Sequence, residues 1–210
     1  MIFIRTNHDI ATSYLYSYTE PLIKEAEQRG FNVIKMEREE ITEDILRKRI
    51  KNQKPTFIFF NGHGNSTSLY GNKGNEFINL NSADVFKTTV TYARSCNCLN
   101  KLGKEAVKKG CSAFIGYKKP FWIARSHKRE CQPLKDNVAE PILESSNTIV
   151  KQLLKGHSVD EAIKKSHETA ADYILKLIYS KEPLASASLQ ALVSNDGALD
   201  YEGEAYARIC

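Results

Sequence analysis

A histidine and a cysteine each follow an apolar run of this sequence, and they are the residues whose types best suit chemistry. His63 comes directly after TFIFFNG, and Cys96 comes directly after TTVTYARS, 33 residues further along the chain (96 − 63). A thiol becomes a strong nucleophile when a neighbouring imidazole accepts its proton. If the two side chains meet, this pair predicts acyl transfer through a covalent intermediate on the thiol.

The elements that must position this pair alternate along the chain. Short β-type runs are expected over residues 2–5, 31–36, 56–61, 88–95 and 112–117, and helix-type segments over residues 14–29, 43–52, 99–109, 136–155 and 159–180. Parallel strands need crossover connections, so this order predicts an α/β fold in one domain covering residues 1–210. We expect a three-layer sandwich, with a mostly parallel sheet of about six strands and helices on both faces. Residues 61–75 and 118–135 are expected to be loops, and residues 184–210 to hold a short helix and a last strand.

In such a sheet, the carboxyl ends of neighbouring strands meet at one edge, where ligands bind. His63 and Cys96 should therefore face each other across that edge. The helix expected to begin near Leu99 would stabilise a thiolate on Cys96. The glycine after His63 leaves the backbone N–H of Gly64 free to point at a developing oxyanion, with the N–H of Cys96 as a second donor.

These motifs resemble those of the caspase-like cysteine peptidases, a group that includes caspases, gingipains, legumain, separase and bacterial CHAT-domain proteins. The block TFIFFNGHG resembles the histidine motif, and VTYARSCNCLNKLGKEAVKKGCSAFIGY resembles the cysteine motif with the helix and strand after it. The resemblance covers residues 55–117 and is weaker over the first strand and helix. Cys96 is followed by Asn97 and Cys98, where the family usually has a small or acidic residue and often a glycine.

The resemblance implies a cysteine endopeptidase that uses His63 and Cys96, with no metal and no organic cofactor. Its partner would be a protein or peptide substrate, and an activating protein partner fits the same picture. The pocket for the residue before the scissile bond, P1, would then lie at the ends of the first, third and fourth strands. Asp9 there suits a basic P1 residue, which bacterial relatives favour, whereas Arg5 and Arg94 suit an acidic one.

The chain offers further residues and further interpretations. Trp122 and Phe121 are candidates for a wall of the substrate groove, the alternative being a hydrophobic plug under the long loop. Basic residues in that loop, in RSHKRE, suggest a site of processing or activation.

The main alternative function is a catalytically inactive caspase-like module that binds or regulates other proteins. A zinc site made of Cys96, Cys98 and His63 lacks the usual spacing and a fourth ligand. Nucleotide binding lacks a glycine-rich or Walker loop.

The five cysteines are an odd number in a chain large enough to fold without disulfides, so we expect free thiols in a reducing compartment. Cys98 and Cys111 are expected to be buried, while Cys131 and Cys210 lie in polar stretches that indicate no bonding partner for their thiols.

The net charge of +5, from 30 basic and 25 acidic residues, does not require nucleic acid as a binding partner. The four-residue apolar run near the N-terminus is too short for a secretory signal, and no stretch is long enough to span a bilayer. We therefore expect a cytoplasmic protein with neither nucleic-acid nor membrane partners.

Overall fold

Six strands form one sheet, in the order β2-β1-β3-β6-β7-β8, in the computed structural model, which describes residues 1–209. The strands are Ile2–Arg5 (β1), Ile34–Glu37 (β2), Phe57–Asn61 (β3), Val90–Arg94 (β6), Ala113–Tyr117 (β7) and Leu199–Gly203 (β8). Neighbouring strands run parallel except for β8, which is antiparallel to β7. The predicted fold class, a three-layer α/β sandwich on a mostly parallel six-stranded sheet, is confirmed.

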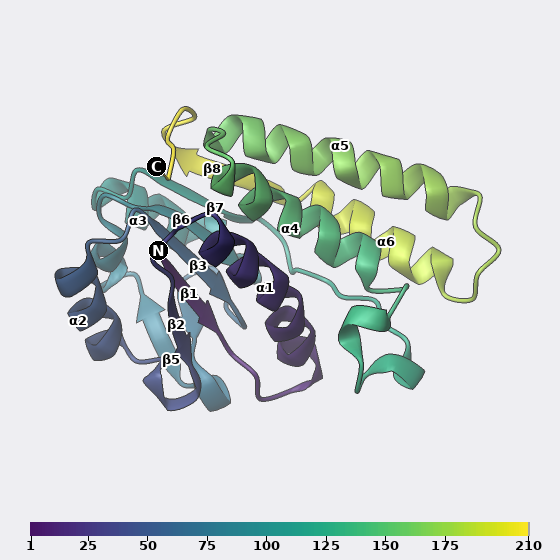
Figure 1. Ribbon diagram of the computed structural model, residues 1–210, viewed down its shortest axis with the longest axis horizontal. Helices are drawn as coiled ribbons and strands as arrows, with labels where there is room; N and C mark the ends of the chain where they lie inside the picture. Colours follow the sequence, from purple (N-terminus) through teal and green to yellow (C-terminus); the bar gives the residue numbers. More distant parts are fainter. Residues whose placement is uncertain (210) are drawn as a thin grey trace.

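Helices cover both faces of this sheet (Figure 1). One face carries α1 and α4, and α5 and α6 pack against α4. The opposite face carries α2 and α3. The bounds are Ile10–Gln28 (α1), Glu43–Gln53 (α2), Lys104–Lys108 (α3), Glu140–Leu154 (α4), Val159–Ile178 (α5) and Ala185–Asp196 (α6). Each face of the sheet therefore has its own hydrophobic core.

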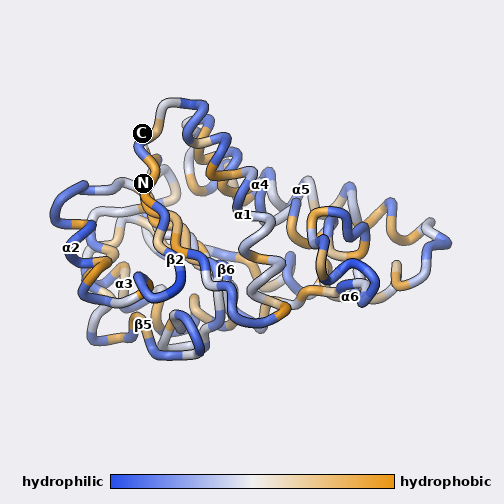
Figure 2. Tube along the Cα trace, turned by 60° about the horizontal axis from the view of Figure 1, so that its bottom comes forward, coloured by the Kyte–Doolittle hydropathy of each residue, from blue (hydrophilic) through white to orange (hydrophobic). Residues whose placement is uncertain are grey.

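The central strands are apolar along almost their whole length because both of their faces are covered. Every residue of β1, β3, β6 and β7 is buried. Successive side chains point to opposite faces, so Phe57 and Phe59 pack towards α1 and α4, and Ile58 and Phe60 towards α2 and α3. Figure 2 shows hydrophobic residues concentrated on the strands and mixed hydropathy along the helices.

Local signals explain where the helices begin and end. Asp9 caps α1: its side chain accepts the Thr12 backbone N–H, and the Thr12 side chain accepts the N–H of Asp9 in return. Thr42 caps α2 with one hydrogen bond, in which its side chain accepts the N–H of Ile45. Beyond α1, Gly30 turns the chain with a φ of 83°, a conformation that glycine adopts without strain.

Two sequence predictions need correction. Residues 61–75, expected to be a loop, contain β4 (Ser68–Tyr70), which pairs with β5 (Glu76–Asn79) in a separate two-stranded sheet. These strands are three and four residues long, too short to show a clear alternating pattern. Helix α1 begins at Ile10 rather than at residue 14, because the Asp9 cap adds a turn before the amphipathic pattern starts.

None of the helices within residues 1–209 has both the length and the apolar character needed to cross a membrane.

Candidate active site

The pairing of β3 with β6 brings the ends of these two strands together. Every paired position differs by 33 residues, from Phe57 with Val90 to Asn61 with Arg94. His63 and Cys96 are also 33 residues apart, and each lies two residues beyond the last pair of this ladder. The Gly62 N–H donates to the Arg94 carbonyl at 3.4 Å, so the two strands remain adjacent past their formal ends. The sequence separation between His63 and Cys96 therefore equals the register of β3 and β6, so the two residues follow adjacent strand ends.

The imidazole of His63 is held by a carboxylate from a third strand end. Its Nε2 lies 2.5 Å from Asp9 Oδ2, and Asp9 follows β1, the neighbour of β3 on the other side. A carboxylate only accepts, so Nε2 carries the proton and Nδ1 is left with a free lone pair. Nδ1 has no hydrogen-bond partner in the part of the chain that the structure describes. The ring is about half exposed (44%) and can therefore meet a substrate.

Asp9 is an ionised group at a helix N-terminus. Partial burial raises its pKa, but the Thr12 backbone N–H and the His63 ring outweigh this effect and hold the pKa below its usual value. Its Oδ1 accepts the Thr12 backbone N–H at 2.8 Å and the Thr12 hydroxyl at 2.9 Å. Both oxygens are thus engaged within the chain. The expected role of Asp9 in binding a basic P1 side chain stays a prediction, and in this structure its oxygens contact Thr12 and His63.

Cys96 turns its thiol towards the segment after β7. The Phe121 N–H donates to Cys96 Sγ at 3.4 Å, and Sγ lies 4.0 Å from the Phe121 carbonyl oxygen. No hydrogen bond joins Cys96 to His63 among residues 1–209. A backbone N–H aimed at sulfur stabilises a thiolate there, and sequence reasoning missed this donor because a main-chain group leaves no signal in the residue types.

The helix expected after Cys96 begins differently from the prediction. Residues Leu99–Gly103 form one turn of π-helix, in which the Gly103 N–H donates to the Cys98 carbonyl at 2.9 Å, and α3 follows. The Asn97 N–H donates to Lys119 O at 3.2 Å rather than to the sulfur. Asn97 itself has a φ of 55°, a left-handed conformation that asparagine tolerates better than most residues.

The two backbone N–H groups expected to bind an oxyanion have no acceptor in the described part of the chain. Neither the Gly64 nor the Cys96 N–H donates a hydrogen bond within residues 1–209. Gly64 bridges to Leu69 of β4 through its neighbours, since Asn65 N–H donates to Ser68 O and Tyr70 N–H to His63 O. The unpredicted hairpin thus fixes the His63–Gly64 backbone while leaving the Gly64 N–H free.

Gly64 packs so closely against Ser95, the residue before Cys96, that a residue with a side chain does not fit there. A Cβ at this position would lie 2.2 Å from Ser95 Oγ and 2.8 Å from the Ser68 carbonyl oxygen. The Ser95 hydroxyl is buried and has no hydrogen-bond partner among the described residues. The glycine in the His63-Gly64 motif therefore serves close approach between two strand ends as well as donor geometry.

The structure places Arg94 away from any substrate surface. Its side chain is completely buried, and its guanidinium donates to Asn61 Oδ1 (2.6 Å), Ser146 Oγ (2.9 Å) and Asn147 Oδ1 (2.8 Å). Burial lowers its pKa from the usual value. The predicted substrate-binding role is therefore replaced by a structural one, which joins β3 and β6 to α4. Arg5, its companion in the acidic-P1 alternative, is buried too, in ion pairs with Glu20 and Glu37.

Trp122 lies on the surface directly after Phe121, whose backbone contacts the Cys96 thiol, and the residue is 57% exposed. Asn195 of α6 holds its backbone at both polar atoms, accepting from the Trp122 N–H and donating to its carbonyl oxygen, each at 2.8 Å. The indole borders an apolar groove between residues 122–124 and α6. Phe121 instead points inwards onto Tyr117, with ring centroids 4.8 Å apart. Trp122 is thus exposed beside this groove, while Phe121 packs against the interior, and a contact of either residue with substrate stays a prediction.

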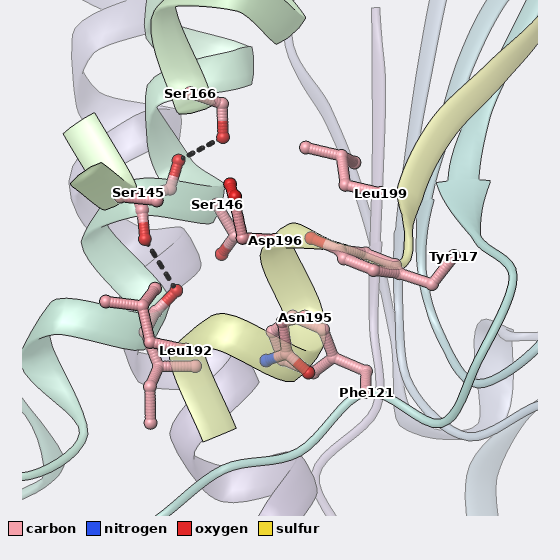
Figure 3. Close-up of a pocket in the computed structure, with 11 residues that line it drawn as sticks. Tyr117, Phe121, Ser145, Ser146, Ser166, Leu192, Asn195, Asp196 and Leu199 are labelled. Atoms are coloured by element: carbon pink, nitrogen blue, oxygen red, sulfur yellow. Dashed lines mark hydrogen bonds between the residues drawn. The ribbon is translucent and has the colours of Figure 1, made fainter. Parts of the chain in front are cut away.

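Behind this segment lies a small cavity between α4, α5, α6 and β7 (Figure 3). Its volume of about 10 Å³ is about the size of one water molecule, which excludes a substrate. In Figure 3, the Ser145 and Ser166 side chains lie at the left of the view, and Asn195 and Phe121 lie towards the lower right. The cavity lies beside Asn195 in the interior and is not part of the surface that a peptide would contact.

The other described cysteines behave as the sequence predicted, and all four described cysteines are free thiols. Cys98 is fully buried, and burial raises its pKa to about 12. Cys111 is buried too, with its pKa raised to about 11. Cys131 is exposed, and Cys210 lies outside the described residues. Cys96 is therefore the thiol that combines partial exposure with a place at the strand edge.

Comparison with known proteins adds no identification. No family model matches the chain, and no curated protein matches it.

Proposed function

We propose that this chain is a cysteine endopeptidase of the caspase-like type, in which His63 activates Cys96. The observation that carries the proposal is the 33-residue register of β3 and β6, which sets the histidine and the cysteine at adjacent strand ends. The Asp9–His63 hydrogen bond supports it further, because it leaves one imidazole nitrogen free to act as a base. Asp9, His63 and Cys96 follow β1, β3 and β6, which are three neighbouring strands of one sheet.

Each group has a role in the proposed reaction. Asp9 holds the proton on Nε2 of His63, so Nδ1 takes the proton of the Cys96 thiol. The thiolate attacks the scissile carbonyl carbon, and the Gly64 and Cys96 N–H groups bind the oxyanion that develops. His63 returns the proton to the leaving amine as the C–N bond breaks. Water then hydrolyses the acyl-enzyme, with His63 as base, and the thiol is regenerated.

The proposed substrate is a peptide segment of a protein, lying along the exposed Trp122 and the groove beside it. A basic P1 residue is the preference that the family resemblance implies. Asp9 is the carboxylate that the sequence offers for such a pocket, and it would have to bind the basic side chain beside its contacts with Thr12 and His63. We also propose a cytoplasmic location, which the free thiols of Cys96, Cys98, Cys111 and Cys131 support. An activating protein partner and processing within residues 118–135 stay predictions.

A non-catalytic binding or regulatory module is the second candidate. The observation that favours it is the orientation of Cys96, whose sulfur contacts the Phe121 backbone and has no hydrogen bond to His63 among the described residues. In the peptidase, this thiol rotates towards the imidazole when substrate binds; in the module, it keeps the Phe121 contact. Catalytic hydrogen bonds in substrate-free enzymes are often long, so the orientation is compatible with both.

Cleavage of a peptide library with every residue at P1 separates these candidates. The wild type should cleave a subset of peptides, with basic P1 residues first. Cys96→Ala should reduce cleavage to background, while the matched control Cys131→Ala, at an exposed cysteine outside the site, should cleave like the wild type. Full activity in Cys96→Ala would eliminate the proposed nucleophile. Mass spectrometry of the intact chain in the same assay tests for processing within residues 118–135.

A further inference from the structure

We propose that His8, Asp9 and His63 form a binding site for one divalent cation of the zinc class. Each residue offers one ligand atom, and these atoms all lie within 4.8 Å of one another. His8 and Asp9 follow β1, and His63 follows β3, the adjacent strand. The three side chains therefore converge just beyond the carboxyl ends of β1 and β3.

The spacing of the ligand atoms is close to that of a tetrahedral site. Asp9 Oδ2 lies 2.5 Å from His63 Nε2 and 3.9 Å from His8 Nε2. Zinc bonds to nitrogen and oxygen are about 2.0–2.2 Å long, which separates tetrahedral ligand atoms by about 3.4 Å. One distance must therefore lengthen by about 0.9 Å and the other shorten by about 0.5 Å to match this geometry. Rotations of the His8 and His63 side chains would have to supply both changes.

The carboxylate is already oriented for this role. Thr12 holds Oδ1 of Asp9 through its backbone N–H and its hydroxyl, which leaves Oδ2 directed at the two imidazoles. Outer contacts of this kind orient metal ligands in proteins. The same Thr12 hydroxyl accepts the backbone N–H of His8 at 3.0 Å. One threonine thus positions two of the three proposed ligands.

His8 turns one ring nitrogen towards the proposed site. Its Nε2 faces Asp9 Oδ2 at 3.9 Å, so Nε2 would bind the cation and the proton of the neutral ring would lie on Nδ1, which is buried and has no hydrogen-bond partner among residues 1–209. The ring packs edge-on to His63, with centroids 5.7 Å apart, so the two imidazoles lie side by side.

The ligand set selects the class of cation. Two imidazoles and one carboxylate, with a fourth position open, match the ligands that zinc takes in protein sites with a free coordination position. Calcium and magnesium prefer oxygen ligands throughout. The N-terminus of α1 adds a partial positive charge beside Asp9, which opposes the cation. We therefore expect micromolar rather than nanomolar affinity.

Cation binding would also regulate the proposed active site, and this consequence rests on the proposed function. A His63 nitrogen that coordinates zinc cannot hold its proton against Asp9, so the tautomer that the base requires is lost. The metal-bound and catalytically competent states would exclude each other. Zinc would act as a reversible inhibitor that leaves the Cys96 thiol in place.

Titration of the metal-free chain with Zn²⁺ by calorimetry tests the site. All chains should carry Cys131→Ser, so that the exposed thiol does not compete. We expect one zinc per chain, and a loss of affinity of about tenfold or more in His8→Ala and in His63→Ala. The matched control is His157→Ala, because His157 also lies near a carboxylate, Glu161, at 3.7 Å. It should bind zinc like the parent chain.

Two further measurements keep this test decisive. Cys96→Ala should retain zinc binding, and its loss there would identify a Cys96–His63 site and overturn the proposal. Unchanged affinity in His8→Ala would overturn it too, with His8→Asn as a second variant if the alanine protein does not fold. Substituted Co²⁺ should give a spectrum without a thiolate charge-transfer band. Because binding needs no turnover, a chain without peptidase activity still tests the metal site, and the two failures remain distinguishable.

Discussion

Asp9 Oδ2 lies 2.5 Å from Nε2 of His63, and these residues follow neighbouring parallel strands. The contact joins the cap of α1 to the candidate base. It gives one carboxylate two separate duties: Oδ1 caps the helix, and Oδ2 orients the imidazole. Because the duties fall on different oxygens, substitutions can separate them.

Asp9→Asn should damage the imidazole contact and spare the helix. Asparagine caps helices about as well as aspartate, so the free energy of unfolding should change little. An amide stabilises the wrong tautomer of His63, so kcat/KM should fall by about 10²–10⁴, mostly in kcat. Steady-state kinetics and urea unfolding measure the two effects.

Asp9→Ala is the matched control, since it removes both duties. Its activity should fall as in Asp9→Asn, and the lost cap should cost about 0.5–2 kcal/mol in addition. A different result would return Asp9 to the role of a substrate ligand: KM rising in Asp9→Asn for basic P1 peptides alone, with kcat unchanged.

The reactivity of the thiols follows from their burial. Iodoacetamide at neutral pH should modify Cys96 and Cys131 and leave Cys98 and Cys111 intact, because burial raises the pKa of the last two to about 12 and about 11. Peptide mass spectrometry gives the rate at each site. His63→Ala should slow the labelling of Cys96 by about tenfold or more through loss of its base. Cys131 is the internal control, and equal slowing of both thiols would refute the pairing of His63 with Cys96.

The sheet and the facing strand ends could be predicted because they depend on strong, regular signals. Runs such as FIFF and the β-branched segment before Cys96 are apolar on both faces, and both-sided burial follows from that pattern. The rule that ligands bind beyond the carboxyl ends of parallel strands then selected His63, Cys96 and Asp9. The same rule covers His8, but its residue type alone does not distinguish a ligand from a surface histidine.

What could not be predicted depends on contacts between distant segments. The arginine two residues before Cys96 suits substrate binding or the core equally well, and only the position of α4 decides between them. The Phe121 N–H on the sulfur and the Asn195 clamp on Trp122 involve backbone atoms, for which residue types carry no code. The hairpin of β4 and β5 was hidden by its short strands.

A histidine outside the site should make stability depend on pH. His167 of α5 lies 2.8 Å from Asp196 at the end of α6, and this hydrogen bond raises its pKa above 6.5 despite partial burial. A raised pKa in the folded state means that the contribution is complete below about pH 6.5 and is lost as pH rises through the folded value. The ring is partly exposed, so the effect should not exceed about 1 kcal/mol.

The test compares the wild type with His167→Gln at about pH 5.5 and about pH 8.5. The variant should be less stable than the wild type at the lower pH, with the difference shrinking at the higher pH. In an Asp196→Asn background, His167→Gln should have no such effect, which isolates the pair. A stability difference that grows with pH would contradict a raised pKa for His167 in the folded protein.

The last prediction concerns Arg94, whose burial separates a structural role from a role at the substrate. Arg94→Lys keeps the charge but cannot reach Asn61, Ser146 and Asn147 together, so buried acceptors lose their donor. Each such group costs about 1–3 kcal/mol, and we expect the midpoint of urea unfolding to fall by the equivalent of at least about 2 kcal/mol. The P1 preference of the protein that remains folded should match the wild type. A stable variant with an altered preference would instead place the guanidinium in contact with substrate, and would require a conformation in which β6 and α4 separate.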